Sequence, residues 1–176
     1  IVLEDFKNKD VVIVQGPPGT GKTHRISQLC DMLCAKGFSV LVTALTNRAL
    51  MEVADKLRES LIKEHKVYKT NLTTDEAKEV NGIQNAEKVY AIPGKLMLST
   101  FYIASGSAVN GYEGPLFDYV IVDEASQAFF AMLAATNMLG YKKLWVGDVY
   151  QMPPIVLMSH DRIKRQGYEP LVNGLD

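Results

Sequence analysis

Eight consecutive residues, Gly16 to Thr23, combine three glycines, two prolines, a lysine and two threonines at a fixed spacing. They fit the pattern G-x-x-x-x-G-K-[ST], between a β-branched apolar run and a helical pattern, which is typical of a phosphate-binding loop. Glycines let successive backbone N–H groups turn toward one phosphate without Cβ clashes, and the following helix adds its positive dipole end. The Lys22 ammonium would reach the β- and γ-phosphates of ATP, and the Thr23 hydroxyl would bind Mg²⁺. We therefore predict ATP and Mg²⁺ as cofactors, bound by Gly16, Pro17, Pro18, Gly19, Thr20, Gly21, Lys22 and Thr23.

Two adjacent carboxylates, Asp123 and Glu124, end a second apolar run over residues 119–122. Because side chains alternate along a strand and the backbone bends at its end, the two carboxylates should point in different directions. One can hold Mg²⁺ through water while the other polarises the attacking water. We assign Asp123 to the metal and Glu124 to the general base. Acids often end strands simply because strands end at solvent, so this assignment depends on the phosphate loop in the same chain.

A third segment, Gly147 to Pro154, follows another apolar run and closes with two prolines. Gln151 lies just beyond the end of that run, in a loop that the prolines stiffen. A glutamine there can hydrogen-bond the γ-phosphate and lose that bond after hydrolysis, which would make it a switch. We therefore add Gln151 to the nucleotide contacts, and propose Lys22, Glu124 and Gln151 as the catalytic residues.

Apolar runs and helical patterns alternate along the chain, and these elements must position the three motifs. Strands are predicted for the short apolar runs and helices for the stretches with apolar residues at helical spacing. Strands separated by helices imply βαβ units, hence an α/β fold with a mostly parallel sheet and helices on both faces. The predicted strands are 11–14, 39–43, 96–99, 119–122 and 143–146, and the predicted helices are 22–36 and 47 to about 63.

Two regions interrupt this alternation. Residues 64–95 are polar, with a turn or cap signal at 73–76, and we expect a surface insertion with a short helix that lies outside the sheet. Residues 106–115 are rich in Gly, Ser and Asn and are predicted to form a mobile loop. The whole chain, residues 1–176, is predicted to be a single domain, because its length suits one core of ordinary size.

Together the motifs resemble those of superfamily 1 helicases, in particular the 5′-to-3′ branch of the nonsense-mediated-decay helicase and senataxin. Residues 15–23 resemble motif I, Q-G-P-P-G-T-G-K-T, and residues 122–128, V-D-E-A-S-Q-A, resemble motif II. Residues 147–154 resemble motif III, G-D-x-x-Q-L-P-P, with Met152 in place of leucine. Residues 41–47 resemble motif Ia, usually A-P-S-N, with Leu45 in place of proline. The resemblance extends over residues 11–156 and implies the first RecA-like P-loop NTPase domain of such a helicase.

The resemblance also implies partners. Thr46, Asn47 and Thr100 would contact the phosphates of single-stranded nucleic acid with little sequence preference. Thr46 is equally an ordinary helix N-cap, and Thr100 an ordinary strand end. A second RecA-like domain, expected C-terminal in the same polypeptide and absent from these 176 residues, would supply arginine fingers and half of the nucleic-acid track.

Composition limits these expectations. The net charge is −1, so the chain lacks the basic character typical of nucleic-acid-binding domains. The apolar runs are too short to span a membrane, no signal peptide is evident, and Cys30 and Cys34 are expected to be buried thiols, which together indicate an intracellular protein.

We expect the chain to be the ATP-binding domain of an ATPase or helicase that moves along single-stranded DNA or RNA. The isolated domain is expected to hydrolyse ATP weakly. A P-loop ATPase that remodels protein partners and an inactive, helicase-like interaction module are the alternatives.

Overall fold

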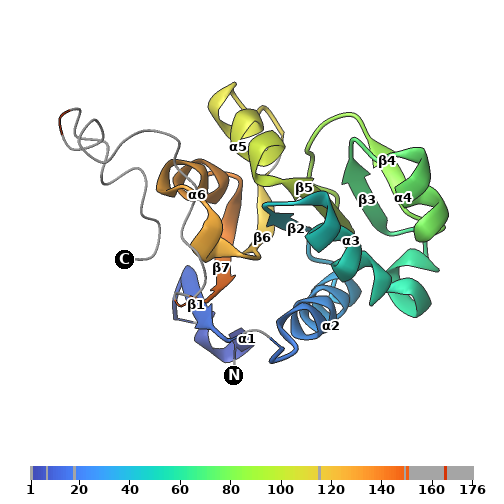
Figure 1. The fold of residues 1–176 in the computed structure, drawn as a ribbon, viewed down its shortest axis with the longest axis horizontal. Coiled ribbons are helices and arrows are strands. Elements are labelled where there is room, and N and C mark those ends of the chain that lie inside the picture. Colours follow the sequence, from blue (N-terminus) through green and yellow to red (C-terminus); the bar gives the residue numbers. More distant parts are fainter. Residues whose placement is uncertain are drawn as a thin grey trace.

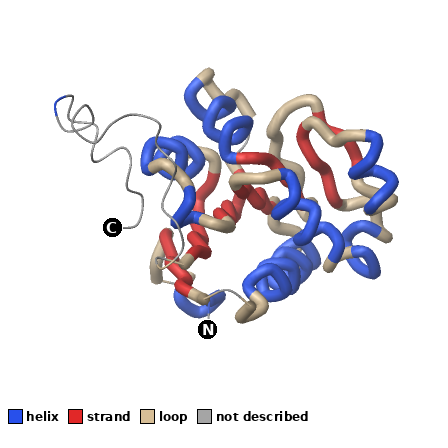
Figure 2. The backbone as a smooth tube through the Cα atoms, in the orientation of Figure 1, coloured by secondary structure: helices blue, strands red, loops and turns tan. Residues whose placement is uncertain are grey.

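The computed structural model describes residues 2–6, 8–17, 19–114, 116–148, 150 and 165. Within these residues seven strands form one sheet in the order β1-β7-β6-β2-β5-β3-β4, and every pair of neighbours is parallel (Figures 1 and 2). The strands are β1 (Val11–Gln15), β2 (Val40–Ala44), β3 (Val67–Thr70), β4 (Gln84–Ala86), β5 (Leu96–Thr100), β6 (Phe117–Val122) and β7 (Gly140–Gly147).

Helices cover both faces of this sheet. They are α1 (Val2–Asp5), α2 (Lys22–Ala35), α3 (Asn47–Asp55), α4 (Thr74–Glu79), α5 (Phe101–Val109) and α6 (Phe130–Asn137), with a π-helical turn at Arg58–Ile62 and a 3₁₀ turn at Ala125–Gln127. Because side chains alternate along a strand, Val40 and Val42 of β2 face one layer while Leu41 faces the other. The predicted α/β fold with a parallel sheet and helices on both faces is confirmed.

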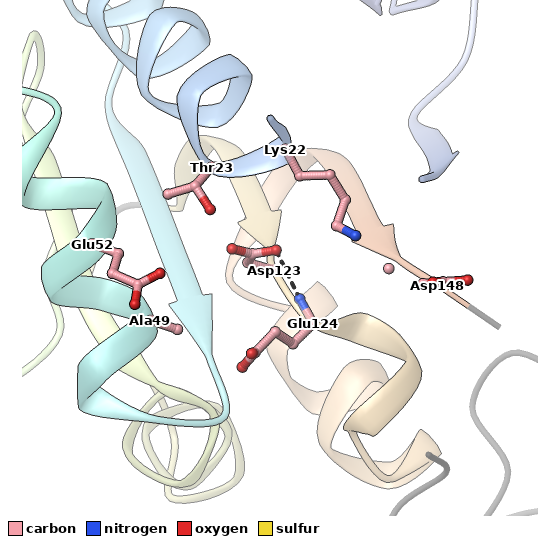
Figure 3. A pocket seen from close by; sticks show the side chains of 8 residues that line it. Lys22, Thr23, Ala49, Glu52, Asp123, Glu124 and Asp148 are labelled. Atoms are coloured by element: carbon pink, nitrogen blue, oxygen red, sulfur yellow. Dashed lines mark hydrogen bonds between the residues drawn. The ribbon is translucent and has the colours of Figure 1, made fainter. Parts of the chain in front are cut away.

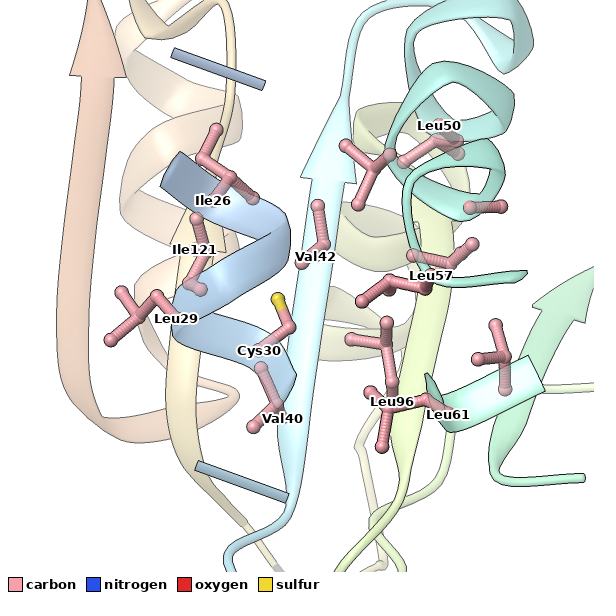
Figure 4. Close-up of a cluster of buried hydrophobic side chains, with 14 of the residues drawn as sticks. Ile26, Leu29, Cys30, Val40, Val42, Leu50, Leu57, Leu61, Leu96 and Ile121 are labelled. Atoms are coloured by element: carbon pink, nitrogen blue, oxygen red, sulfur yellow. The ribbon is translucent and has the colours of Figure 1, made fainter. Parts of the chain in front are cut away.

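The core on one face lies between the sheet and helices α2 and α3. Ile26, Leu29 and Cys30 of α2 pack toward Val42 and Ile121 (Figure 4). The predicted apolar stripe of the second long helix is buried over its full length: Leu50, Val53, Ala54, Leu57 and Leu61 are each at most 3% exposed. The helix itself ends earlier than predicted, at Asp55, and the π-helical turn carries the stripe onward.

The core on the other face is formed by α5 and α6. Phe101 and Ala104 of α5 and Leu133 of α6 pack against Val120 and Val122 of β6. The predicted loop over residues 106–115 is therefore partly wrong, because α5 continues to Val109. Packing overrides the weak helix propensity of its Gly and Ser residues, because Ala108 is buried in the same core.

The expectation that residues 64–95 lie outside the sheet is wrong. They supply β3 and β4, which extend the sheet beyond β5, although the predicted short helix is present as α4. Because β3 is polar, the pattern of apolar runs in the sequence does not indicate a strand there. Lys69 is fully buried and pairs with Glu76 of α4 at 3.0 Å, and the Thr70 hydroxyl donates to the Ser99 hydroxyl at 3.0 Å. Partners of this kind allow polar side chains in a buried strand.

Cys30 and Cys34 are free and buried on α2, and burial raises the pKa of Cys34 to about 12, as expected of inert thiols. Among the described residues, no helix combines the length and the apolar character needed to cross a membrane.

Candidate nucleotide-binding site

The parallel topology brings the motifs to one edge of the sheet. The phosphate loop follows β1, Asp148 follows β7, the acid pair follows β6, and residues 45–47 follow β2. These four strands are consecutive neighbours, so their carboxyl ends lie in a row. Crevices at the carboxyl ends of parallel strands are the usual ligand sites of open α/β sheets.

The phosphate loop joins β1 directly to the start of α2. Gly19 and Gly21 both have φ of 76°, a left-handed conformation that side chains with a Cβ rarely adopt. The Gly16 N–H donates to the Gly147 carbonyl at 3.0 Å, which ties the start of the loop to the end of β7. Pro18 lies outside the described residues, so its predicted contact stays a prediction.

Lys22 and Thr23 begin α2, as predicted for the last residues of the motif. The Lys22 ammonium donates to the carbonyls of Gly16 and, at 3.2 Å, Pro17. These bonds hold the ammonium across the loop that would surround a phosphate. Thr23 lines the same pocket as Lys22 (Figure 3).

The acid pair turns the chain sharply at the end of β6. The Asp123 N–H donates to the Thr43 carbonyl at 2.9 Å, so pairing with β2 continues to the first acid. Glu124 then adopts a left-handed conformation with φ of 56°, and its N–H donates to the Asp123 carboxylate at 2.9 Å. The two carboxylates point in different directions (Figure 3), as the alternation of side chains predicted.

Both acids lie in a poorly solvated environment. Burial is the main cause that raises the pKa of Asp123 above its ordinary value, although the Glu124 N–H and the Lys22 charge act in the opposite direction. Burial likewise raises the pKa of Glu124, with further contributions from the negative charges of Asp123 and Glu52. One Glu124 oxygen, Oε2, is buried and has no hydrogen-bond partner among the described residues. A buried carboxylate oxygen of this kind calls for a water or a cation.

The pocket between these elements is lined by Lys22, Thr23, Ala49, Glu52, Asp123, Glu124, Gly147 and Asp148. The lining groups that could bind a cation are the Thr23 hydroxyl and the carboxylates. Oxygen donors of this kind suit a hard divalent cation such as Mg²⁺. Among the described residues, no three His, Cys, Asp or Glu side chains form a ready-made metal cluster.

Two acids in this pocket were not proposed from the sequence. Asp148 is only 2% exposed and accepts a hydrogen bond from the Tyr150 N–H at 3.1 Å. Its place in the G-D-x-x-Q segment could have indicated it. Glu52 comes from the middle of α3, where no motif marks it, and reaches the pocket only because α3 packs beside α2.

The predicted nucleic-acid residues lie on neighbouring strand ends. Strands β2 and β5 pair with Ala44 opposite Thr100, so Thr46 and Asn47 follow the strand that adjoins Thr100. Thr46 and Asn47 are exposed and Thr100 is half-buried. Thr46 also caps α3, because its hydroxyl accepts the Ala49 N–H at 3.2 Å. Gln151, the predicted γ-phosphate sensor, lies outside the described residues.

Comparisons with known proteins agree with this arrangement. A family model described as "AAA domain" matches residues 2–157. "DNA replication ATP-dependent helicase/nuclease DNA2" of Saccharomyces cerevisiae is 30% identical over 174 residues, covering 93% of this chain and 11% of that protein. This chain therefore spans only a small part of the length of that relative.

Solved structures share the fold at low sequence identity. The Type ISP restriction-modification enzyme LlaGI, a nuclease-deletion mutant bound to a DNA substrate mimic, superposes with a TM-score of 0.59 at 16% identity. That match covers 94% of this chain and 19% of LlaGI. Arterivirus nonstructural protein 10, a helicase in complex with DNA, gives a TM-score of 0.52 at 17% identity, over 86% of this chain and 32% of the helicase.

The parallel sheet, the phosphate loop and the acid pair define a nucleotide-binding domain of the P-loop class. The chain belongs to the AAA domain family. The resemblance to superfamily 1 helicases is confirmed by the similarity to that ATP-dependent helicase/nuclease, and the chain has the fold of a RecA-like helicase domain.

Proposed function

We propose that the chain is the ATP-binding domain of an ATPase that couples hydrolysis to translocation on single-stranded DNA or RNA. The observation that carries this proposal is the meeting of Lys22, Thr23, Asp123 and Glu124 in one pocket at the carboxyl edge of the sheet. The relative named above is an ATP-dependent helicase/nuclease, and one structural neighbour is a helicase in complex with DNA.

The residues of the loop would bind the phosphates. Backbone N–H groups of the loop and the start of α2 would surround the β-phosphate, as in other P-loop domains. Lys22 would exchange its bonds to the Gly16 and Pro17 carbonyls for the β- and γ-phosphate oxygens. The Thr23 hydroxyl and, through water, the Asp123 carboxylate would hold Mg²⁺, which supplies positive charge to the phosphates.

Glu124 would act on the attacking water. Its raised pKa makes the carboxylate a stronger base than an ordinary glutamate. Its Oε2 has no hydrogen-bond partner among the described residues and could accept a hydrogen bond from that water. Gln151 would complete the site by contacting the γ-phosphate and releasing it after hydrolysis.

The nucleic-acid track would cross the neighbouring strand ends. Thr46 and Asn47 after β2, and Thr100 at the end of β5, would contact phosphates of the strand. A second RecA-like domain of the same polypeptide would complete the track and supply an arginine finger. Since arginine fingers contribute about 10³- to 10⁵-fold in related phosphoryl-transfer systems, the isolated domain should hydrolyse ATP slowly.

The proposal predicts that nucleotide and single-strand binding are linked. In the full-length protein, the affinity for a labelled single-stranded oligonucleotide should differ several-fold between the ADP-bound state and the state bound to a non-hydrolysable ATP analogue. A motor must alternate between tight and weak binding of the strand during its ATPase cycle. Fluorescence anisotropy at fixed salt concentration measures this difference.

A double substitution and its control locate the track in the same assay. Asn47→Ala with Thr100→Val should weaken oligonucleotide binding by about tenfold and leave nucleotide affinity unchanged. Thr74→Val, at an exposed position on α4, serves as the control. Oligonucleotide binding that is independent of the nucleotide would argue against a motor. An absence of oligonucleotide binding would favour a P-loop ATPase acting on protein partners.

A further inference from the structure

Glu52 extends from α3 into the nucleotide pocket, although the functions assigned above leave it without a role. Its carboxylate enters the pocket from the α3 side, with Thr23 and Asp123 between it and Lys22 in the view of Figure 3. The side chain is 53% exposed, so it remains hydrated while facing the buried acid pair. An acid in this place adds negative charge where the phosphates and the cation would meet.

Glu52 lines the same pocket as both residues of the acid pair. Four carboxylates line the described part of the pocket, those of Glu52, Asp123, Glu124 and Asp148, against the single ammonium of Lys22. A pocket with this balance repels the phosphates of a nucleotide unless a cation enters with them.

Arg48 holds Glu52 from outside the pocket. Its Nε lies 3.3 Å from the Glu52 carboxylate, one turn along α3, and its Nη1 lies 3.2 Å from the carboxylate of Glu79 at the end of α4. The Arg48 side chain is 70% exposed. One guanidinium is therefore shared between an acid of the pocket and an acid of residues 64–95, and it only partly neutralises Glu52.

We propose that Glu52 is a further acid of the divalent-cation site, acting through water of the ion's hydration shell, and that Arg48 limits how much of its negative charge reaches the ion. The proposal rests on the Mg²⁺–nucleotide binding proposed above. Action through water suits the exposure of Glu52 and the tendency of Mg²⁺ to keep several of its waters. Glu52 is thus a positioning residue, distinct from the acids that face the reacting atoms.

The test is a measurement of cation binding that needs neither hydrolysis nor nucleic acid. Mn²⁺ serves as the probe, and electron paramagnetic resonance follows free Mn²⁺ during titration into the full-length protein saturated with ADP. Glu52→Gln should weaken Mn²⁺ binding by about three- to tenfold, because an amide replaces a carboxylate close to the ion. Arg48→Gln should strengthen it by about two- to threefold, because Glu52 loses its counter-ion.

Controls separate this role from a structural one. Glu87→Gln removes an exposed acid just after β4, at the far edge of the sheet, and should leave Mn²⁺ affinity unchanged. ADP affinity in EDTA should be unchanged or slightly higher in Glu52→Gln, since a repulsive charge is lost. An exposed ion pair contributes little to folding stability, so Glu52→Gln and Arg48→Gln should both melt near the wild-type temperature.

Three outcomes would overturn the proposal. The first is an Mn²⁺ affinity of Glu52→Gln equal to that of Glu87→Gln, and the second is a change of Mn²⁺ affinity in the same direction for Glu52→Gln and Arg48→Gln. The third is a loss of ADP affinity in EDTA by Glu52→Gln that is as large as its loss of Mn²⁺ affinity. Should Glu52→Gln fail to fold, the direction of the Arg48→Gln effect alone decides. The Mn²⁺ titration contains no nucleic acid. Failure of the proposed motor function would therefore appear in the separate oligonucleotide assay, as single-strand binding that does not depend on the nucleotide.

Discussion

Replacing Lys22 with alanine is expected to weaken the binding of ADP and ATP to the full-length protein by about 10²- to 10³-fold. The Lys22 ammonium is the only positive side chain among the described residues that line the pocket, where it faces four carboxylates. Without it, the phosphates would meet mainly negative charge. Titration with a fluorescent ADP analogue in the presence of Mg²⁺ measures the loss.

Lys36→Ala is the matched control for this substitution. Lys36 caps the other end of α2 and is exposed, so its removal changes the net charge equally without touching the pocket. Nucleotide affinity should stay near that of the wild type in Lys36→Ala. A Lys22→Ala protein that bound nucleotide within threefold of the wild type would contradict the assignment of the phosphate loop.

Glu124→Gln is expected to keep nucleotide binding and to lower the rate of ATP hydrolysis by about 10²-fold or more in the full-length protein. The amide keeps the size of the side chain but cannot take a proton from water. Affinity for ATP should be equal or higher, because a negative charge next to the γ-phosphate is lost. Phosphate release measured at saturating ATP, alongside nucleotide titration, separates the two effects.

The control here is Glu59→Gln, a substitution of an exposed glutamate in the π-helical turn. It should hydrolyse ATP at the wild-type rate. Hydrolysis by Glu124→Gln within tenfold of the wild type would remove Glu124 from the role of general base. A joint loss of binding and hydrolysis would instead indicate that Glu124 supports the structure of the pocket.

Local patterns in the sequence predicted much of the fold. The strands before the phosphate loop and before the acid pair are continuous apolar runs, and both are present as β1 and β6. Strand β3 could not be predicted in this way, because Lys69 and Thr70 are polar, and their burial depends on hydrogen-bond partners that include Glu76 and Ser99. Those partners lie on other elements, where a local pattern does not reveal them.

In the candidate site, too, some residues could be predicted from local sequence patterns and others could not. Lys22, Thr23, Asp123 and Glu124 are marked by motifs whose spacing follows from a strand, a tight loop and a helix, and the structure brings them into one pocket. Glu52 carries no such mark, since its place in the pocket depends on the packing of α3 beside α2. Likewise, the left-handed conformation of Glu124 is a property of the folded turn and not of its residue type.

We propose that this domain hydrolyses ATP in response to single-stranded nucleic acid. The direct measurement is the steady-state ATPase rate of the full-length protein, without nucleic acid and with saturating single-stranded DNA or RNA of mixed sequence. We expect the rate to rise about tenfold or more with at least one of the two nucleic acids, and we expect no rise in Glu124→Gln. An unchanged rate with both DNA and RNA would contradict it.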